Sequence, residues 1–245
     1  MLGLCALPLI SSQVFAQEIT LDLGQDATSG TVTGRIIQLL VVITVISLAP
    51  SILIMMTSFT RIIVVLSLLR TALGIQQTPP NSVLIALAMF LTMFIMTPTL
   101  TAAYNNGLVP LINEEINQED ALLATAEPFR DFMGLHVREA DLELFMQVSD
   151  TQAESLEDVP FHVIIPAFMI SELRRAFEIG FMLFLPFLII DMVTAFILMS
   201  MGMMMLPPII ISLPFKIIFF VLVDGWYLIA GSLLQSFDVP AIPGG

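Results

Sequence analysis

The sequence predicts an all-α fold of membrane-associated helical hairpins, and three observations carry this prediction. Hydrophobic residues make up 57% of the 245 residues and charged residues only 12%, whereas soluble domains have about 45–50% and about 25%. Four apolar runs with at most two charged residues each are long enough to cross a bilayer. An acidic segment separates the first two runs from the last two. We therefore expect two long apolar hairpins with an inserted acidic helical subdomain.

The predicted segments follow one another along the chain, divided where the apolar runs end and the charges gather. They are a signal peptide (1–16), an N-terminal periplasmic segment (17–34), a first apolar helical hairpin (35–105), an acidic periplasmic helical subdomain (106–160), a second apolar helical hairpin with a methionine-rich tip (161–238) and a C-terminal tail (239–245).

Residues 1–16 are typical of a secretory signal peptide, because they are apolar and end in the small or apolar residues Val14-Phe15-Ala16. They lack the usual basic residue, since the first one in the chain is Arg35. We expect cleavage after Ala16 and an N-terminus outside the cytoplasm; an uncleaved apolar N-terminus is the alternative. The one cysteine, Cys5, lies in this segment, which excludes disulfides within the chain and cysteine nucleophiles.

The first hairpin is predicted from the uncharged runs 36–59 and 83–104. Residues 50–73 also look helical, and one helix over 36–73 would be about 57 Å long, nearly twice a hydrocarbon core of about 30 Å. Either Pro50 bends this helix, or part of its apolar surface is buried against protein. The polar cluster at residues 57–61 is interpreted as interfacial packing or a helix–helix contact.

Each hairpin is expected to turn at a Gly-x4-Pro-Pro pattern. Glycine commonly ends helices, and proline cannot continue one. The six residues that we expect to break the helices at the two tips are Gly74, Pro79, Pro80, Gly202, Pro207 and Pro208.

The topology that these runs predict agrees only in part with the positive-inside rule. With the N-terminus outside, Arg61 and Arg70 lie inside, as the positive-inside rule prefers, but Arg174 and Arg175 fall outside. Ionisable residues in apolar helices usually face a partner or a wet cavity. We therefore expect a multi-subunit assembly that shields much of the helical surface from lipid.

Residues 106–160 hold 13 of the 21 acidic residues, opposed only by Arg130 and Arg138. We interpret them as a helical subdomain that lies outside and begins a helix near Pro128; a solvated loop is the alternative. No EF-hand spacing supports a calcium site. The apolar residues that recur at helical spacing are Phe129, Phe132, Met133, Leu142, Phe145 and Met146.

The sequence favours neither an enzyme nor a nucleic-acid-binding protein. Eight Lys and Arg against 21 Asp and Glu give a net charge of −13 and no basic patch for phosphates. There is no P-loop, His-Glu-x-x-His motif or Gly-x-Ser-x-Gly elbow. His136 and His162 lack a second ligand at helical spacing. We predict no catalytic residues, metal or cofactor.

Charged residues in and beside the second hairpin are the first candidate site. Arg174 and Glu178 are spaced as neighbours on one helix face, whereas Asp191 and Lys216 could pair within the hairpin or between subunits. Ion pairs that hold helices or subunits together are the preferred interpretation, and a proton or ion relay is the alternative. The residues of this candidate site are Glu172, Arg174, Glu178, Asp191 and Lys216.

The second candidate is the methionine-rich tip at residues 201–205. Methionine is flexible and polarizable, so it adapts to irregular surfaces. Symmetric copies of this tip could form a soft apolar ring that blocks water and ions by dewetting. Filling a core or facing lipid is the simpler alternative, which residue spacing alone favours.

Residues 48–98, which include SFTRIIVVLSLLRTALG, and residues 184–233, which include DMVTAFILMSMGMMMLPP, resemble the FliP family. This is a family of flagellar export-gate proteins related to the SctR components of virulence type III secretion systems. The resemblance covers essentially the whole chain. The chain departs visibly from this family in one respect, because no basic residue precedes Arg35 in the signal-peptide region. This departure concerns the position of the start codon.

The resemblance implies a non-enzymatic pore component in the bacterial inner membrane at the flagellar basal body. Several copies would assemble with FliQ and FliR into a ring, completed by FlhB and FlhA, that passes unfolded flagellar subunits outward. It implies a methionine gasket at Met203, Met204 and Met205 and important charges at Glu172, Asp191 and Lys216. The alternatives are a virulence export-gate component, a small ion-coupled transporter in membrane lipid and, last, an intramembrane enzyme.

Overall fold

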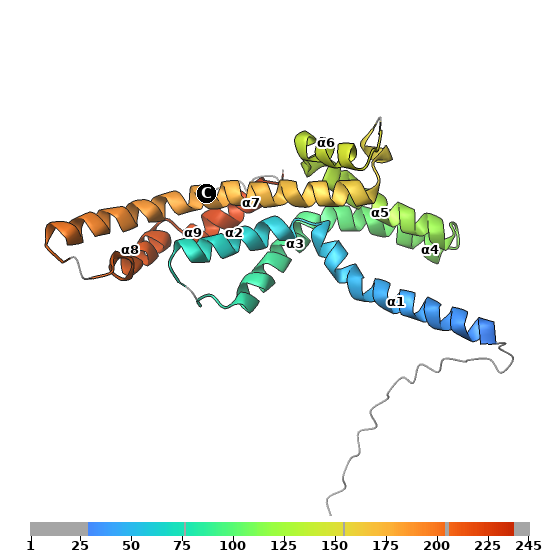
Figure 1. Cartoon of the computed structure of the whole chain (residues 1–245), viewed down its shortest axis with the longest axis horizontal. Coiled ribbons are helices and arrows are strands. Elements are labelled where there is room, and N and C mark those ends of the chain that lie inside the picture. The colour runs from blue at the N-terminus through green and yellow to red at the C-terminus, as the bar shows by residue number, and fades with distance from the viewer. Residues whose placement is uncertain (1–28, 76, 154, 204–205, 238–245) are drawn as a thin grey trace, which may run out of the picture. The chain divides into compact units, whose positions relative to one another are not determined.

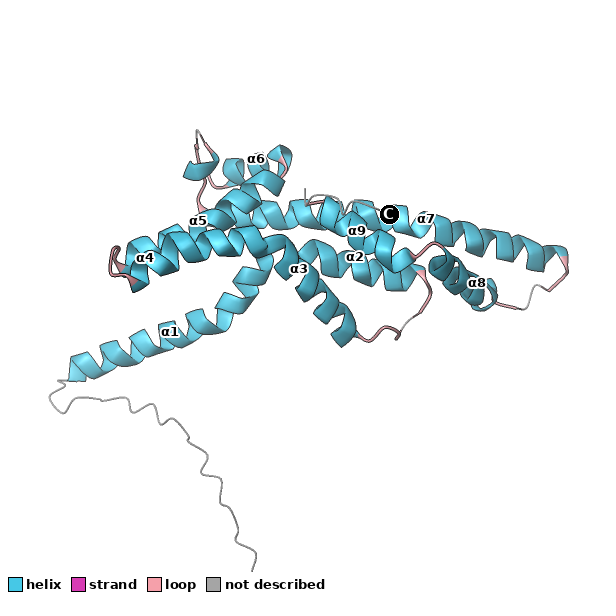
Figure 2. Ribbon diagram, turned by 180° about the vertical axis from the view of Figure 1, so that it is seen from behind, coloured by secondary structure: helices cyan, strands magenta, loops and turns pink. Residues whose placement is uncertain are grey.

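The computed structural model describes residues 29–75, 77–153, 155–203 and 206–237, and every element in these ranges is a helix (Figures 1 and 2). The expected signal peptide, the C-terminal tail, Met204 and Met205 lie outside the described residues. The elements are α1 (Ser29–Met55), α2 (Phe59–Ala72), α3 (Asn81–Ala103), η1 (Tyr104–Leu108), α4 (Val109–Ile112), α5 (Gln118–His136), α6 (Glu139–Val148), η2 (Leu156–Asp158), α7 (Phe161–Ser200), α8 (Pro208–Leu222) and α9 (Gly225–Gln235). The predicted all-α fold is confirmed.

The chain divides into two compact units, residues 1–48 and residues 49–245. Most of α1 belongs to the first unit, and α2 to α9 belong to the second. In the second unit, α2 packs mainly against α7 and also against α3, while α5 and α6 pack against α7 (Figure 1). The core therefore lies around α2, with Ile62, Val65, Leu66 and Leu69 at its centre.

The long helix considered for residues 36–73 is broken at residues 56–58, and α1 continues through Pro50. The break has a local cause at Thr57. Its Oγ1 donates to the carbonyl oxygen of Ile54 at 3.0 Å and accepts from the amide of Phe59 at 3.4 Å. A hydroxyl that bonds the backbone in this way competes with the regular helical bonds. The interruption that one of the two alternatives placed at Pro50 therefore lies at residues 56–58, about two turns later.

The first hairpin consists of α2 and α3, and its tip spans residues 73–80. Gly74 has φ +78°, a left-handed conformation that glycine adopts without a steric penalty. The Thr78–Pro79 peptide bond is cis, and Pro80 precedes the first residue of α3. The Gly-x4-Pro-Pro pattern thus occupies the turn between the two helices.

The second hairpin consists of α7 and α8, followed by α9. Gly202 has φ +75°, and α8 begins at Pro208 directly after Pro207. The apolar run 209–237 is not one helix, because α8 and α9 meet at Asp224 with a bend of 63°. Asp224 itself has φ +52°, which interrupts the helical path.

Two helical stretches among the described residues are long and apolar enough to cross a membrane, residues 81–112 and 161–200. The bent pair of α8 and α9 adds a third if it counts as one span. The 40 residues of α7 extend over about 60 Å, twice a typical hydrocarbon core. At least half of α7 must therefore lie outside the hydrocarbon or be strongly tilted.

The acidic subdomain contains two main helices, α5 and α6. α5 begins after Asn117, whose side-chain oxygen accepts from the amide of Asp120 at 2.9 Å, a typical N-cap. Pro128 lies in the interior of α5, so its placement in a first helical turn was wrong. The chain breaks before α6 at Arg138, whose amide donates to Ser171 Oγ of α7 at 3.1 Å.

Candidate functional site

Arg61 and Glu172 form an ion pair inside the second unit, between α2 and α7. Arg61 Nε donates to Glu172 Oε2 at 2.8 Å, and Arg61 Nη2 donates to Glu172 Oε1. Both residues are 0% exposed. Two parallel bonds between a guanidinium and a carboxylate are the strongest common form of this interaction. The pair therefore joins the two hairpins at one defined register.

The free side of the Arg61 guanidinium is bound by the end of the second hairpin. Its Nη1 donates to the carbonyl oxygen and the Oγ of Ser236, at 2.9 and 3.0 Å. The ring of Phe237 covers the guanidinium, with 3.6 Å between Cζ and the ring centroid. Phe237 also contacts the His136 ring of α5, at 5.2 Å between centroids. Arg61 thus connects α2, α7, the residues after α9 and the acidic subdomain.

Asp191 and Lys216 form a second ion pair, between the two arms of the second hairpin. Lys216 Nζ donates to Asp191 Oδ2 at 2.6 Å, and Ser212 Oγ donates to Asp191 Oδ1 at 2.5 Å. Lys216 is 3% exposed, whereas the Asp191 side chain is 34% exposed. Within one copy of the chain this is therefore an intrahairpin pair.

Lys216 also contacts the first hairpin. Its Nζ donates to the carbonyl oxygen of Ala72, the last residue of α2, at 3.1 Å. The last carbonyls of a helix lack helical partners and carry partial negative charge, so an ammonium group stabilises them. Lys216 of α8 is consequently bound by both α2 and α7.

The remaining charges of the set lie at the surface of α7. Arg174 Nε donates to Glu178 Oε1 at 3.0 Å, with both side chains more than half exposed. Such an exposed pair contributes little to stability. Arg175 is half-buried beside them. These residues are not part of either buried pair.

The described residues of the methionine-rich tip follow α7 directly, and their methionine side chains are exposed. Met201 and Met203 are 66% and 42% exposed. The amide of Met203 donates to the carbonyl oxygen of Leu198 at 3.0 Å, which closes the end of the helix. Met204 and Met205 lie outside the described residues.

Apolar side chains are exposed along α3, α7 and α8. Phe90 is 72% exposed and Leu222 is 79% exposed. Many large apolar side chains exposed on the same helices mark contact with protein or lipid. Further strongly exposed members are Met93 and Phe94 on α3, Phe177, Phe181, Met182 and Phe196 on α7, and Ile209, Ile210, Phe215 and Val221 on α8.

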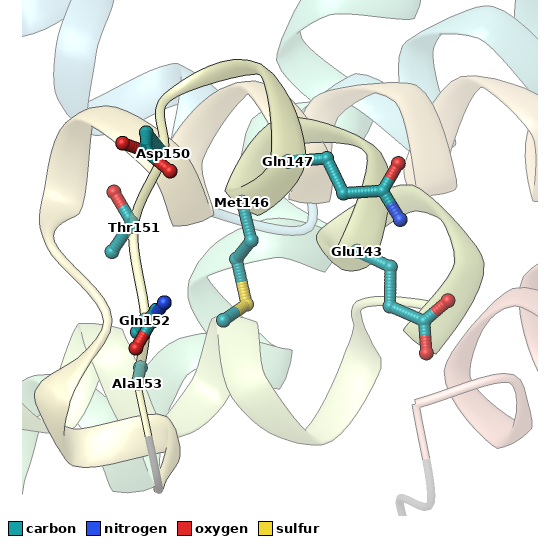
Figure 3. Close-up of a pocket in the computed structure, with 7 residues that line it drawn as sticks. All are labelled: Glu143, Met146, Gln147, Asp150, Thr151, Gln152 and Ala153. Atoms are coloured by element: carbon teal, nitrogen blue, oxygen red, sulfur yellow. The ribbon is translucent and has the colours of Figure 1, made fainter.

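The acidic subdomain has a hollow beside α6 and the loop that follows it (Figure 3). It measures about 650 Å³, and its two charged residues, Glu143 and Asp150, come from α6 and the loop after it. No group of three metal-ligating side chains occurs among the described residues. The other lining residues are Met146, Gln147, Thr151, Gln152 and Ala153.

Sequence reasoning missed three contacts of these sites. It placed Arg61 in a polar cluster and did not connect it with Glu172, 111 residues later. It also missed Ser212 and the Ala72 carbonyl as partners of Asp191 and Lys216. A signal for Arg61 was present, because a cation in an apolar block requires a buried partner.

The FliP family model matches residues 42–233, which include both buried ion pairs. The chain belongs to the FliP family. Curated relatives support this over nearly the whole length. The flagellar biosynthetic protein FliP of Caulobacter vibrioides is 53% identical over 239 residues, 97% of this chain and 89% of that protein. The protein of the same name from Bacillus subtilis is 58% identical over 202 residues, 82% of this chain and 91% of that protein.

A third relative agrees with the first two. The flagellar biosynthetic protein FliP of Aquifex aeolicus is 52% identical over 205 residues, 82% of this chain and 86% of that protein. Membership of the FliP family and the long apolar helices together support a membrane location. The family is one of structural and transport components rather than of known enzymes.

Proposed function

We propose that this chain is a pore-forming subunit of the flagellar type III protein export gate in the bacterial inner membrane. Unfolded flagellar subunits would pass outward through a ring built from several copies with FliQ and FliR, next to FlhB and FlhA. The acidic subdomain would lie on the periplasmic side. Membership of the FliP family, whose curated relatives are flagellar biosynthetic proteins, is the starting point.

The observation that carries the proposal is the apolar surface left uncovered on three helices. α3, α7 and α8 expose large side chains such as Phe90, Phe196 and Phe215 by 57% or more. A lipid bilayer covers only about 30 Å of helix, whereas α7 extends over about 60 Å. The excess apolar surface therefore requires protein partners, and neighbouring copies with FliQ and FliR would supply them.

The two buried ion pairs fit a structural role in such a subunit. Arg61 is bound to Glu172 and Ser236, and Lys216 is bound to Asp191 and Ala72. A coupling-ion site needs ligands that the ion can reach and exchange. The hydrogen bonds from both cations to neighbouring helices support ion pairs that hold the hairpins in register over an ion relay.

The methionine-rich tip is the proposed closing element of the pore. Met201 and Met203 project from a turn, and their flexible side chains can seal an irregular opening against water and ions. They can also yield to an extended polypeptide. A ring of such tips would therefore block leakage while subunits are exported.

Replacement of residues 203–205 by alanine tests the gasket. The purified complex would be reconstituted in planar bilayers, and its ion conductance would be compared with that of the unaltered complex. A matched control replaces three other exposed methionines, Met89, Met93 and Met182. We expect a large rise in conductance for the tip variant alone. Unchanged conductance, with assembly verified by native mass spectrometry, contradicts the gasket.

A further inference from the structure

The charges of the two hairpins leave one cation and one anion without a partner. The side chains of Arg175 on α7 and Asp224, at the bend between α8 and α9, form no hydrogen bond and no ion pair with the described residues. We propose that Arg175 of one copy of the chain pairs with Asp224 of the neighbouring copy. The inference rests on the proposed function, because it requires several copies in one complex.

The other charged residues of the hairpins are bound within the chain. Residues 49–105 and 161–237 contain nine Lys, Arg, Asp and Glu residues. Seven of them have partners among the described residues, so one positive and one negative charge are left. The bound groups are Arg61 with Glu172, Lys216 with Asp191, Arg174 with Glu178, and Arg70 with Asn81.

Arg175 lies in a position where a cation requires a partner. It is half-buried in α7, a helix apolar enough to cross a membrane. It interacts electrostatically with Glu172, but both oxygens of that carboxylate accept from Arg61 and none is bonded to Arg175. Ionisable residues in apolar helices usually pair with an opposite charge or face a wet cavity. The partner of Arg175 is therefore expected from outside this copy.

Asp224 has the complementary requirement. It is exposed where α8 and α9 meet at 63°, and its side chain does not cap α9 although it precedes that helix directly. Large apolar side chains, such as Leu222 and Trp226, are exposed on both sides of it. Protein that covers this apolar surface also removes water from the carboxylate, which is costly unless a cation is supplied with the covering surface.

The two charges do not meet within one copy, because they lie near opposite ends of α9. Asp224 precedes α9, whereas Ser236 follows it and is bound to Arg61, the partner of Glu172. Arg175 lies one turn after Glu172, and α9 extends over about 17 Å. A second copy carries the same two charges. Each interface would then join Arg175 of one copy to Asp224 of the next, which is the head-to-tail contact that generates rings.

Charge exchange between copies tests this pair. Arg175→Asp and Asp224→Arg would be produced separately, and then together with different tags, each time with FliQ and FliR. Either variant alone places like charges at every interface, so the yield of multi-copy complex should fall about tenfold or more. Alternation of the two variants restores opposite charges. Co-expression should therefore recover the complex, and each tag should capture the other variant.

The matched control is Arg174→Asp, the same change one residue earlier on α7. The partner of Arg174 is Glu178 of the same copy, so Arg174→Asp alone should keep most of the yield and should not rescue Asp224→Arg. The inference is overturned if co-expression recovers no complex or if Arg174→Asp rescues as well as Arg175→Asp. It is also overturned if Asp224→Arg alone is harmless, because Arg175 then binds another group, such as a lipid phosphate.

A second measurement does not depend on charge reversal. Arg175→Cys in one tagged copy and Asp224→Cys in the other, both with Cys5→Ser, leave one thiol in each copy. A short bismaleimide should join the two tags in the assembled complex. No cross-link in a verified complex overturns the inference. A wild-type chain that forms no multi-copy complex contradicts the proposed function instead, so the two failures are distinguishable.

Discussion

Glu172→Gln should strongly destabilise the protein, because it removes the charge that compensates a fully buried cation. Arg61 is 0% exposed, and the glutamine can accept only one of the two bonds that Glu172 accepts. Breaking one side of a buried pair costs about 3–5 kcal/mol. At about 2–4 °C per kcal/mol for a chain of this size, the melting temperature should fall by roughly 6–20 °C.

The matched control is Glu178→Gln, the same chemical change two turns further along α7. Its partner Arg174 is exposed, and such a helical pair contributes about 0.3–0.5 kcal/mol. The melting temperature should therefore fall by less than about 2 °C. Thermal unfolding of the detergent-solubilised complex, followed by far-UV circular dichroism, measures both variants.

A double variant separates the lost charge from lost packing. Arg61→Met combined with Glu172→Leu removes both charges and keeps the apolar volume, and such replacements are often neutral or better. It should recover most of the melting temperature lost in Glu172→Gln. Equal shifts for Glu172→Gln and Glu178→Gln, or a double variant as unstable as the single one, would refute the reasoning.

Two further predictions concern the contacts between helices. Asp191→Ala should destabilise the complex by about 2–4 kcal/mol and weaken assembly, whereas Lys216→Met should cost less, because only the Asp191 variant leaves a buried cation short of a partner. Thermal unfolding and native mass spectrometry check both, and normal assembly with arrested export would indicate a direct transport role. Gly180→Ala should cost about 1–3 kcal/mol, since its Cβ would overlap the Leu68 side chain. Thermal unfolding should show that Gly180→Ala and Leu68→Ala are not additive; additive losses contradict the contact.

Local chemistry in the sequence predicted much of the fold. Uncharged runs and the acidic interruption predicted helices throughout, which the structure confirms for the described residues. The break before α2 was missed because it depends on which way the Thr57 hydroxyl turns. Pro128 was misplaced because the stronger start signal, Asn117, lies eleven residues earlier and caps α5.

The partners of the buried charges could not be derived from spacing. Arg61 and Glu172 are 111 residues apart, and only the packing of α2 on α7 brings them together. The bond from Lys216 to the Ala72 carbonyl could not be predicted from side-chain types, because every residue has a backbone carbonyl. What the sequence could show is that each charge in an apolar helix requires a partner. Tertiary packing then selects which one.

Native mass spectrometry of the complex extracted in detergent tests the central claim most directly. The chain would be co-expressed with FliQ and FliR and purified through a tag on this chain alone. We predict one large hetero-oligomer that contains several copies of the chain, because its exposed apolar helices require protein neighbours. A stable, dispersed single chain in the presence of both partners would contradict the account.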